Sequence, residues 1–216
     1  AGNVFAANQT ALVVTGLTIP ANGNCTFTFV VTSDTPGVNP NATSGVASTQ
    51  AATGAVSNTA NLTVTAATPT IAKAFAPASI AADGTSTITF TLANTNGVAL
   101  TGAGFTDTLA NMSINAAGAA GGTCTGAGSN SFAAAQTALT FTGLTIPANG
   151  NCTVTVIVTS DIVGVNPNTT TGVTSAQAAI GAAANTANRT VTAVVPTIAK
   201  AFAPASIAAD GTSTIT

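Results

Sequence analysis

The run CTVTVIVT, from Cys152 to Thr159, alternates apolar residues with mostly small polar ones. Successive side chains of a β-strand point to opposite faces of the sheet, so this period of two predicts a strand with one buried face. The run STITFTLAN, from Ser86 to Asn94, has the same period. No comparable stretch spaces its apolar residues as an amphipathic helix does. The sequence therefore predicts an all-β protein.

The segments around these strands occur twice, 127 residues apart. TGLTIPANGNCT begins at Thr15 and again at Thr142, and PTIAKAFAPASIAADGTSTIT begins at Pro69 and again at Pro196. A repeat of this length matches one whole domain. We expect the chain to be an internal stretch of a longer tandem array. Its predicted parts are the C-terminal part of one repeat domain (1–67), a complete domain (68–194) and the first strands of the next repeat (195–216).

The complete domain contains about eight short strands, separated by residues that favour turns. That many short strands in a domain of this size indicate an immunoglobulin-like antiparallel β-sandwich, with a closed barrel as the weaker alternative. Short connections between successive domains predict a fairly stiff rod.

Charge is scarce: the 216 residues include three Lys or Arg, five Asp or Glu and no His. Three basic residues cannot neutralise a phosphate backbone, which argues against nucleic acid as a partner. No apolar run approaches the roughly 18 residues of a membrane span. A Ser-His triad, a zinc site and a glycosidase carboxylate pair all lack parts, so we expect no enzyme, metal or cofactor. An uncharged surface suits self-association in a fibre, or a covering of glycans.

Four motifs carry a family resemblance: TIAKAFAPASIAADGTSTITFTLAN, GAGFTDTL, ANGNCTVTV and NTANRTV. The series resembles the immunoglobulin-like repeats of bacterial and archaeal surface proteins, and the resemblance spans the whole 127-residue unit. It implies an extracellular or cell-surface location, in a stalk, an adhesin, a sheath or a surface fibre. One departure is Ala110, which follows Leu109 where that family commonly has Pro.

The three cysteines fit the repeat. Cys124 and Cys152 lie in the complete domain, whereas Cys25 is equivalent to Cys152 and its partner would precede the first residue. We predict a disulfide between Cys124 and Cys152, which suits an oxidising extracellular setting. Two reduced buried thiols are the alternative.

Strand alternation sends three polar residues toward the core: Lys73, Asp107 and, in the last strand, Asn185. Buried charges must be paired, so one hypothesis is a Lys–Asp ion pair with Asn as a hydrogen-bond partner. The other resembles the intramolecular isopeptide bonds of bacterial pilins and adhesins. There, a Lys on the first strand attacks an Asn on a late strand, assisted by a carboxylic acid.

Two functions remain open from the sequence. The favoured one is a structural repeat module of an extracellular filament or surface stalk, stiffened by cross-links within the domain. The alternative is an adhesin domain that binds a host or cell-surface ligand. Adhesive surfaces are rich in aromatic and charged residues, and these repeats have few of either.

Overall fold

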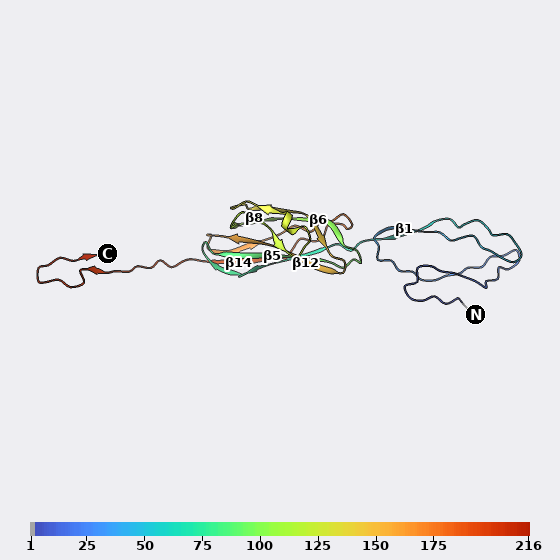
Figure 1. Ribbon diagram of the computed structural model, residues 1–216, viewed down its shortest axis with the longest axis horizontal. Coiled ribbons are helices and arrows are strands. Elements are labelled where there is room, and N and C mark those ends of the chain that lie inside the picture. Colours follow the sequence, from blue (N-terminus) through green and yellow to red (C-terminus); the bar gives the residue numbers. More distant parts are fainter. Residues whose placement is uncertain (1–2) are drawn as a thin grey trace. The chain divides into compact units, whose positions relative to one another are not determined.

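The computed structural model describes residues 3–216, and strands make up its regular structure apart from one short helical turn (Figure 1). That turn is the 3-10 helix η1 (Ala127–Ser129). In the described part of the chain, no helix is long and apolar enough to cross a membrane. The all-β prediction is thus confirmed. The chain divides into two compact units, with the boundary between residues 33 and 34.

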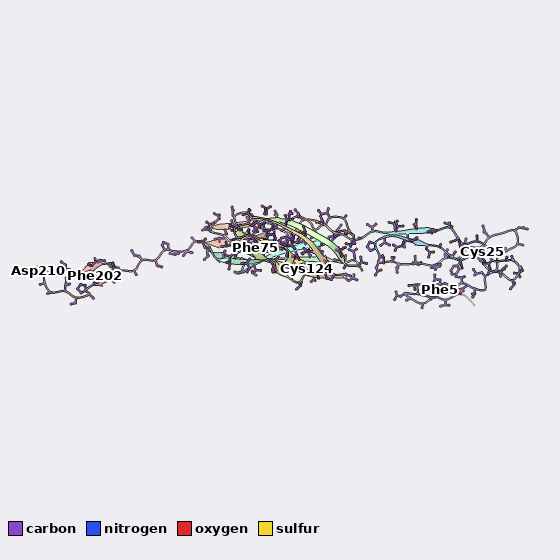
Figure 2. The ribbon with its side chains drawn as sticks, turned by 45° about the horizontal axis from the view of Figure 1, so that its top comes forward. Phe5, Cys25, Phe75, Cys124, Phe202 and Asp210 are labelled. Carbon is purple, nitrogen blue, oxygen red and sulfur yellow. A yellow bond between two sulfur atoms is a disulfide. The ribbon has the colours of Figure 1, made fainter. Side chains whose placement is uncertain are left out.

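The first unit has no regular strand among its described residues. Its most compact feature is a cluster of three rings, Phe5, Phe27 and Phe29 (Phe5 is labelled in Figure 2), with ring centroids 5.9, 6.0 and 5.7 Å apart. Stacked or edge-on contacts at this range are favourable for aromatic side chains. The described residues of this unit thus have aromatic side-chain contacts and no strand ladder.

All strands among the described residues lie in the second unit. Its outer parts in the sequence are two antiparallel pairs: β1 (Gly37–Asn41) with β2 (Ala60–Val64), and β15 (Phe202–Ala203) with β16 (Thr214–Ile215). Between them lies the central domain, residues 70–192. Its strands are β3 (Thr70–Ala76), β4 (Ser79–Ala81), β5 (Thr85–Asn94), β6 (Leu100–Thr108), β7 (Ser113–Ile114), β8 (Gly118–Ala119), β9 (Gly121–Gly122), β10 (Ser131–Phe132), β11 (Ala138–Ile146), β12 (Gly150–Thr159), β13 (Gly164–Asn168) and β14 (Ala187–Thr192).

The main sheet of the central domain has the strand order β3-β5-β12-β7, and β9 also pairs with β12. The run Cys152–Thr159 forms nearly all of β12, which lies antiparallel to β5 along ten residue pairs (Figure 1). Alternation in both strands places apolar side chains on one face, for example Leu92 opposite Cys152. The strand predicted from this alternation therefore lies inside the main sheet, with neighbours on both sides.

Two smaller sheets complete the domain. β11 pairs antiparallel with β6, with irregular register around Gly143, whose φ is 67°. β13 and β14 pair antiparallel, and β4 joins β14 in parallel. Single bridges, including Asp107 with Thr170, connect β6 to the segment after β13. The prediction of antiparallel sheets is confirmed, with β4 as an exception.

The core joins the inner faces of these sheets. Phe90 of β5 contacts Phe105 of β6 at a centroid distance of 5.0 Å, and Phe105 stacks on Phe141 of β11 at 4.5 Å. Phe132 of β10 packs on Phe141 from another side at 5.0 Å. Burying such rings contributes roughly 1.5–3 kcal/mol each. The fold also buries polar side chains, among them Lys73, Asp107 and Arg189.

Candidate functional site

Lys73 is enclosed because of its place on β3. The strand TIAKAFA alternates exposed and buried residues, and Lys73 shares the buried face with Ile71 and Phe75. Its ammonium side chain is fully buried. Moving an ammonium from water into a protein interior is costly unless polar groups replace the lost water. The polar groups around Nζ therefore determine whether the fold tolerates the buried ammonium.

Three oxygen atoms surround the Lys73 ammonium. Nζ donates to Oγ1 of Thr170 at 2.7 Å, to Oδ1 of Asp107 at 3.3 Å and to Oδ1 of Asn168. Lys73 lies on β3 and Asp107 on β6. Asn168 is the last residue of β13, and Thr170 follows two residues later. We call Lys73, Asp107, Asn168 and Thr170 the Lys73 cluster. The topology gathers them from segments up to 97 residues apart in the chain.

The other contacts of the cluster fix its orientation. Thr170 accepts from the ammonium and donates its hydroxyl proton to Oδ1 of Asp107 at 2.5 Å. Nδ2 of Asn168 donates to the main-chain oxygen of Thr108 at 2.7 Å, which turns Oδ1 toward Lys73. Oδ2 of Asp107 is buried without a hydrogen-bond partner. Oδ1 of Asp107 is thus held in place by hydrogen bonds, and Oδ2 has no hydrogen-bond partner.

The electrostatics of the cluster shift Lys73 toward the neutral amine without removing its ion pair with Asp107. Burial lowers the pKa of Lys73 below its ordinary value, and the charge and hydrogen bond of Asp107 offset part of that shift. A desolvated lysine is the usual form of a nucleophilic lysine in proteins. The cluster therefore brings together a desolvated lysine, a carboxamide and a carboxyl group.

The structure places the three residues that the sequence predicted for this site in two different roles. Lys73 and Asp107 face each other as expected. Asn185 precedes the first residue of β14, and its side chain is exposed. Its amide accepts from the main-chain nitrogen of Lys73 at 2.9 Å and donates to the main-chain oxygen of Lys73 at 3.1 Å. It therefore contacts the backbone of β3, and the carboxamide at Nζ belongs to Asn168.

Sequence reasoning missed Asn168 and Thr170. β13 reads GVNPN, and it buries Asn166 and Asn168 while its valine is exposed. A strand that buries its polar residues and exposes its apolar ones reverses the usual pattern. The alternation rule, which takes the apolar face as the buried one, therefore could not identify these residues. The sequence repeat offered another way to identify them, because Asn168 and Thr170 are identical to the residues 127 positions earlier, Asn41 and Thr43.

Arg189 is a second buried cation. It lies on the inner face of β14 with Ala187 and Val191, and it is 0% exposed. Its side-chain nitrogens have no hydrogen-bond partner. Desolvation lowers the pKa of its guanidinium from the ordinary value. The equivalent residue of the preceding repeat is Leu62, an apolar residue.

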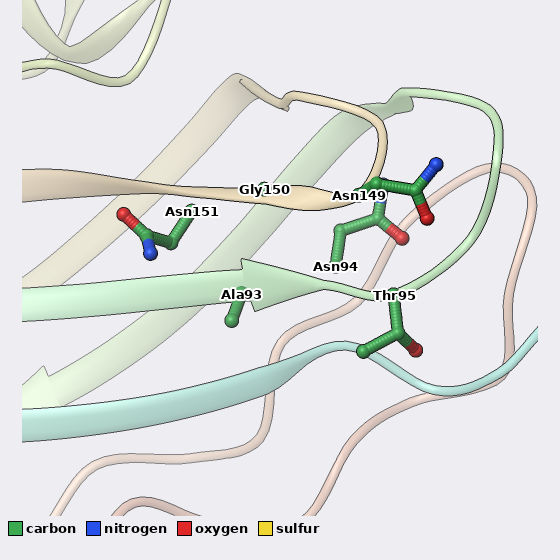
Figure 3. Close-up of a pocket in the computed structure, with 6 residues that line it drawn as sticks. All are labelled: Ala93, Asn94, Thr95, Asn149, Gly150 and Asn151. Carbon is green, nitrogen blue, oxygen red and sulfur yellow. The ribbon is translucent and has the colours of Figure 1, made fainter.

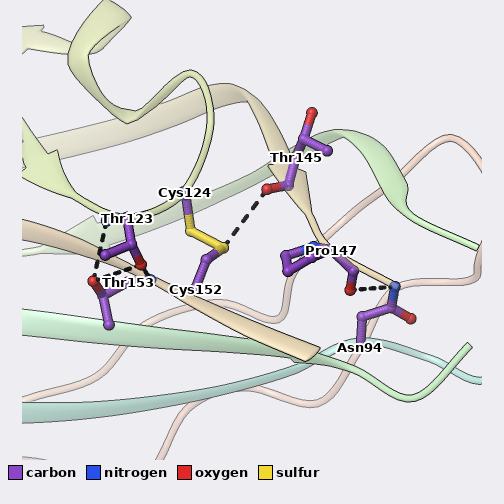
Figure 4. The surroundings of a disulfide bond; sticks show 7 residues. All are labelled: Asn94, Thr123, Cys124, Thr145, Pro147, Cys152 and Thr153. Atoms are coloured by element: carbon purple, nitrogen blue, oxygen red, sulfur yellow. Dashed lines mark hydrogen bonds between the residues drawn. A yellow bond between two sulfur atoms is a disulfide. The ribbon is translucent and has the colours of Figure 1, made fainter. Parts of the chain in front are cut away.

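The disulfide joins Cys124 to Cys152 of β12, 28 residues apart, which is the pair that the sequence predicts (Figure 4). Beside it, Thr123 and Thr153 exchange hydrogen bonds, with the main-chain nitrogen of Thr153 donating to Oγ1 of Thr123 at 2.9 Å. Sγ of Cys152 lies 3.6 Å from the Thr145 oxygen, a van der Waals contact, because a disulfide sulfur has no proton to donate. Cys25 is exposed and unpaired with another cysteine.

A shallow hollow lies where β5 ends and β12 begins, lined by Ala93, Asn94, Thr95, Asn149, Gly150 and Asn151 (Figure 3). Nδ2 of Asn94 is committed to the main-chain oxygens of Val98 and Pro147. No titratable side chain lines the hollow. Across residues 3–216, no group of three or more His, Cys, Asp or Glu is placed to hold a metal ion. The Lys73 cluster therefore remains the site with the most distinctive chemistry.

The chain matches a protein family. The profile of the family described as a domain of unknown function, DUF7933, matches residues 69–192, which is more than half of the chain. No curated protein matches it.

Proposed function

The chain belongs to the family of domains of unknown function DUF7933, and we propose that its central domain is a structural module of an extracellular filament or surface stalk. In this proposal the module is an immunoglobulin-like β-sandwich that recurs in tandem. It acts by bearing load and by packing against its neighbours, and it performs no catalytic turnover.

The proposal rests on the positions of the central domain's charged side chains, most of which are buried. Residues 69–192 contain five charged side chains. Lys73, Asp107 and Arg189 are buried, which leaves Asp83 and Asp161 as the exposed ones. A soluble free-standing domain ordinarily has about a quarter of its residues charged. A surface with two charges suits a domain that is covered by other copies in a fibre, or by glycans.

The disulfide supports an extracellular setting. Disulfides form and persist in oxidising compartments and are rare in the cytosol. The bond between Cys124 and Cys152 ties the segment after β9 to the central strand of the main sheet. A cross-link within the domain limits how far the chain extends under load, which suits a stalk or filament.

The repetition supports a tandem arrangement. Residues 1–89 recur as residues 128–216 with short identical runs, including the TIAKAFAPASI segment that contains Lys73 and, 127 residues later, Lys200. Recurrent units with near-identical sequences give successive domains the same surface, which favours regular packing. An adhesin domain is the second candidate, with its ligand bound by loops at the end of an array.

Immunogold electron microscopy of the cells that produce the protein tests the proposal, using antibodies raised against the 216-residue chain. We expect gold particles along the whole length of extracellular filaments or stalks. Label confined to the tips of such structures, with saturable binding of the chain to a glycan array, would favour the adhesin. Label inside the cells would overturn both extracellular functions.

A further inference from the structure

The Lys73 cluster contains the parts of a self-modification reaction. We propose that Nζ of Lys73 and Cγ of Asn168 become joined by an amide bond inside the folded domain, with Asp107 as the proton carrier and ammonia as the leaving group. The bond would connect β3, the first strand of the main sheet, to the end of β13. It forms once per molecule and needs no cofactor.

The geometry selects Asn168 as the acceptor. Its Oδ1 faces the Lys73 amine, and the hydrogen bond from its Nδ2 to the Thr108 oxygen holds the carboxamide in that orientation. Asn185 contacts the main chain of Lys73 instead. An amine and a carboxamide held together in a fixed geometry react far faster than the same groups free in solution.

Water is excluded from the cluster. Lys73 is 5% exposed, Asp107 2%, Asn168 1% and Thr170 3%. A dry site lowers the cost of separating from the ion-pair form, because both charges have already lost their hydration. Transfer of one proton from the ammonium to Asp107 produces a neutral pair of amine and carboxylic acid, in which the amine can attack.

The bonds and protons then balance as follows. The Nζ lone pair attacks Cγ of Asn168, and a tetrahedral intermediate forms. Asp107 gives its proton to the departing Nδ2 and takes one from Nζ. The Cγ–Nδ2 bond breaks, ammonia leaves, and the product is a secondary amide between Lys73 and Asn168. No oxidant or reductant is required.

Asp107 and Thr170 have distinct parts in this reaction. Oδ1 of Asp107 is anchored by the Thr170 hydroxyl at 2.5 Å, while the buried Oδ2 has no partner and is available to relay the proton. Thr170 is a positioning residue, because it orients both the amine and the carboxyl group. A buried, uncommitted carboxylate oxygen beside an amine is otherwise an unexplained cost.

This inference does not rest on the filament proposal, because the bond forms in a single folded domain wherever that domain is located. The test uses the 216-residue chain, purified, reduced and denatured. We expect its intact mass to be lower than the sequence mass by one ammonia, and tandem mass spectrometry to find one peptide that joins Lys73 to Asn168.

The chain provides its own control for proteolysis. Lys200 lies in the same TIAKAFAPASI sequence as Lys73 and is exposed. A lysine-specific protease should therefore cleave the denatured chain after Lys200 and leave Lys73 uncut, since an acylated lysine is not a substrate. Cleavage after both lysines, together with the full sequence mass, would overturn the inference.

Variants identify the acceptor and the proton carrier. The Lys73→Gln, Asn168→Ala and Asp107→Asn chains should each have the full mass, and Asn185→Ala should retain the loss of ammonia. Persistence of the bond in Asn168→Ala, or its absence in Asn185→Ala while the domain remains folded, would transfer the acceptor role to Asn185. Loss of water in place of ammonia in the wild-type chain would make Asp107 the acceptor. Each of these results contradicts the Lys73–Asn168 assignment, and the wild-type peptide evidence stands even if a variant fails to fold.

Discussion

At the scale of single residues, the central domain satisfies one buried cation and leaves another without partners. Lys73 has three oxygen atoms at Nζ, whereas the guanidinium of Arg189 has none. An unsatisfied buried polar group costs about 1–3 kcal/mol. Lys73 therefore has a polar binding site within the fold, whereas Arg189 is buried without one.

We predict that Arg189→Leu stabilises the domain by about 1–3 kcal/mol, because it removes an unpartnered cation and restores the residue type found at Leu62. Denaturant unfolding of the 216-residue chain measures the change. Asn188→Ala, on the exposed face of the same strand, is the matched control and should change the free energy of unfolding little. A lower stability for Arg189→Leu would show that Arg189 has a partner in solution.

How much of the site the sequence predicts depends on the regularity of each strand. Lys73 and Asp107 lie in runs where apolar residues mark the buried face, so the alternation rule identifies both as buried. Asn168 lies in a strand whose asparagines point inward, so the same rule fails there. Asn185 was predicted to face the core as part of the last strand, but that strand begins at Ala187. Alternation carries no information before a strand begins.

At the scale of elements, β12 organises the central domain. It pairs with β5, β7 and β9, and it carries Cys152. Period-two alternation was sufficient to predict this strand and its partner β5. The short strands β7 to β10 have only two residues each, so no periodicity could predict them. They are defined by their pairing with distant parts of the chain.

The disulfide should contribute to stability through the unfolded state. Closing a loop of 28 residues predicts a loss of about 3–4 kcal/mol in the free energy of unfolding when Cys124 and Cys152 are both replaced by Ser. Chemical unfolding of the chain measures it. Cys25→Ser, introduced as the background in every variant to prevent thiol exchange, should have no effect on the central domain. A loss below about 1 kcal/mol would contradict the chain-entropy explanation.

Gly122 permits the close approach of β9 to β12. Its φ is 116°, and an added Cβ would lie 2.2 Å from the main-chain oxygen of Thr153. Gly102 has φ 59° and open space around it, which makes it a matched control. We predict that Gly122→Ala is more destabilising than Gly102→Ala, which should cost about 1 kcal/mol through its backbone conformation alone. Equal losses in thermal unfolding would show that β9 shifts to make room.

At the scale of the whole molecule, the chain combines one closed domain with sequences that repeat its parts. The central domain has an apolar core and an exterior that carries two charges. The 127-residue sequence repeat is the basis for the proposed array, and the all-β architecture follows from the alternation. The family match adds membership of DUF7933. These features do not determine the function, because the proposed load-bearing role would need no catalytic residues for a motif search to find.

The most direct test of a covalently stiffened module is to stretch single chains held at both ends, with the disulfide reduced. We predict that unfolding the wild-type domain releases only residues outside the Lys73–Asn168 bond. Lys73→Gln should release the enclosed segment as well, in which 95 residues at about 3.3–3.6 Å each add roughly 310–340 Å. Equal extension of wild-type and variant chains would contradict the claim, and would leave the domain with the disulfide as its single internal cross-link.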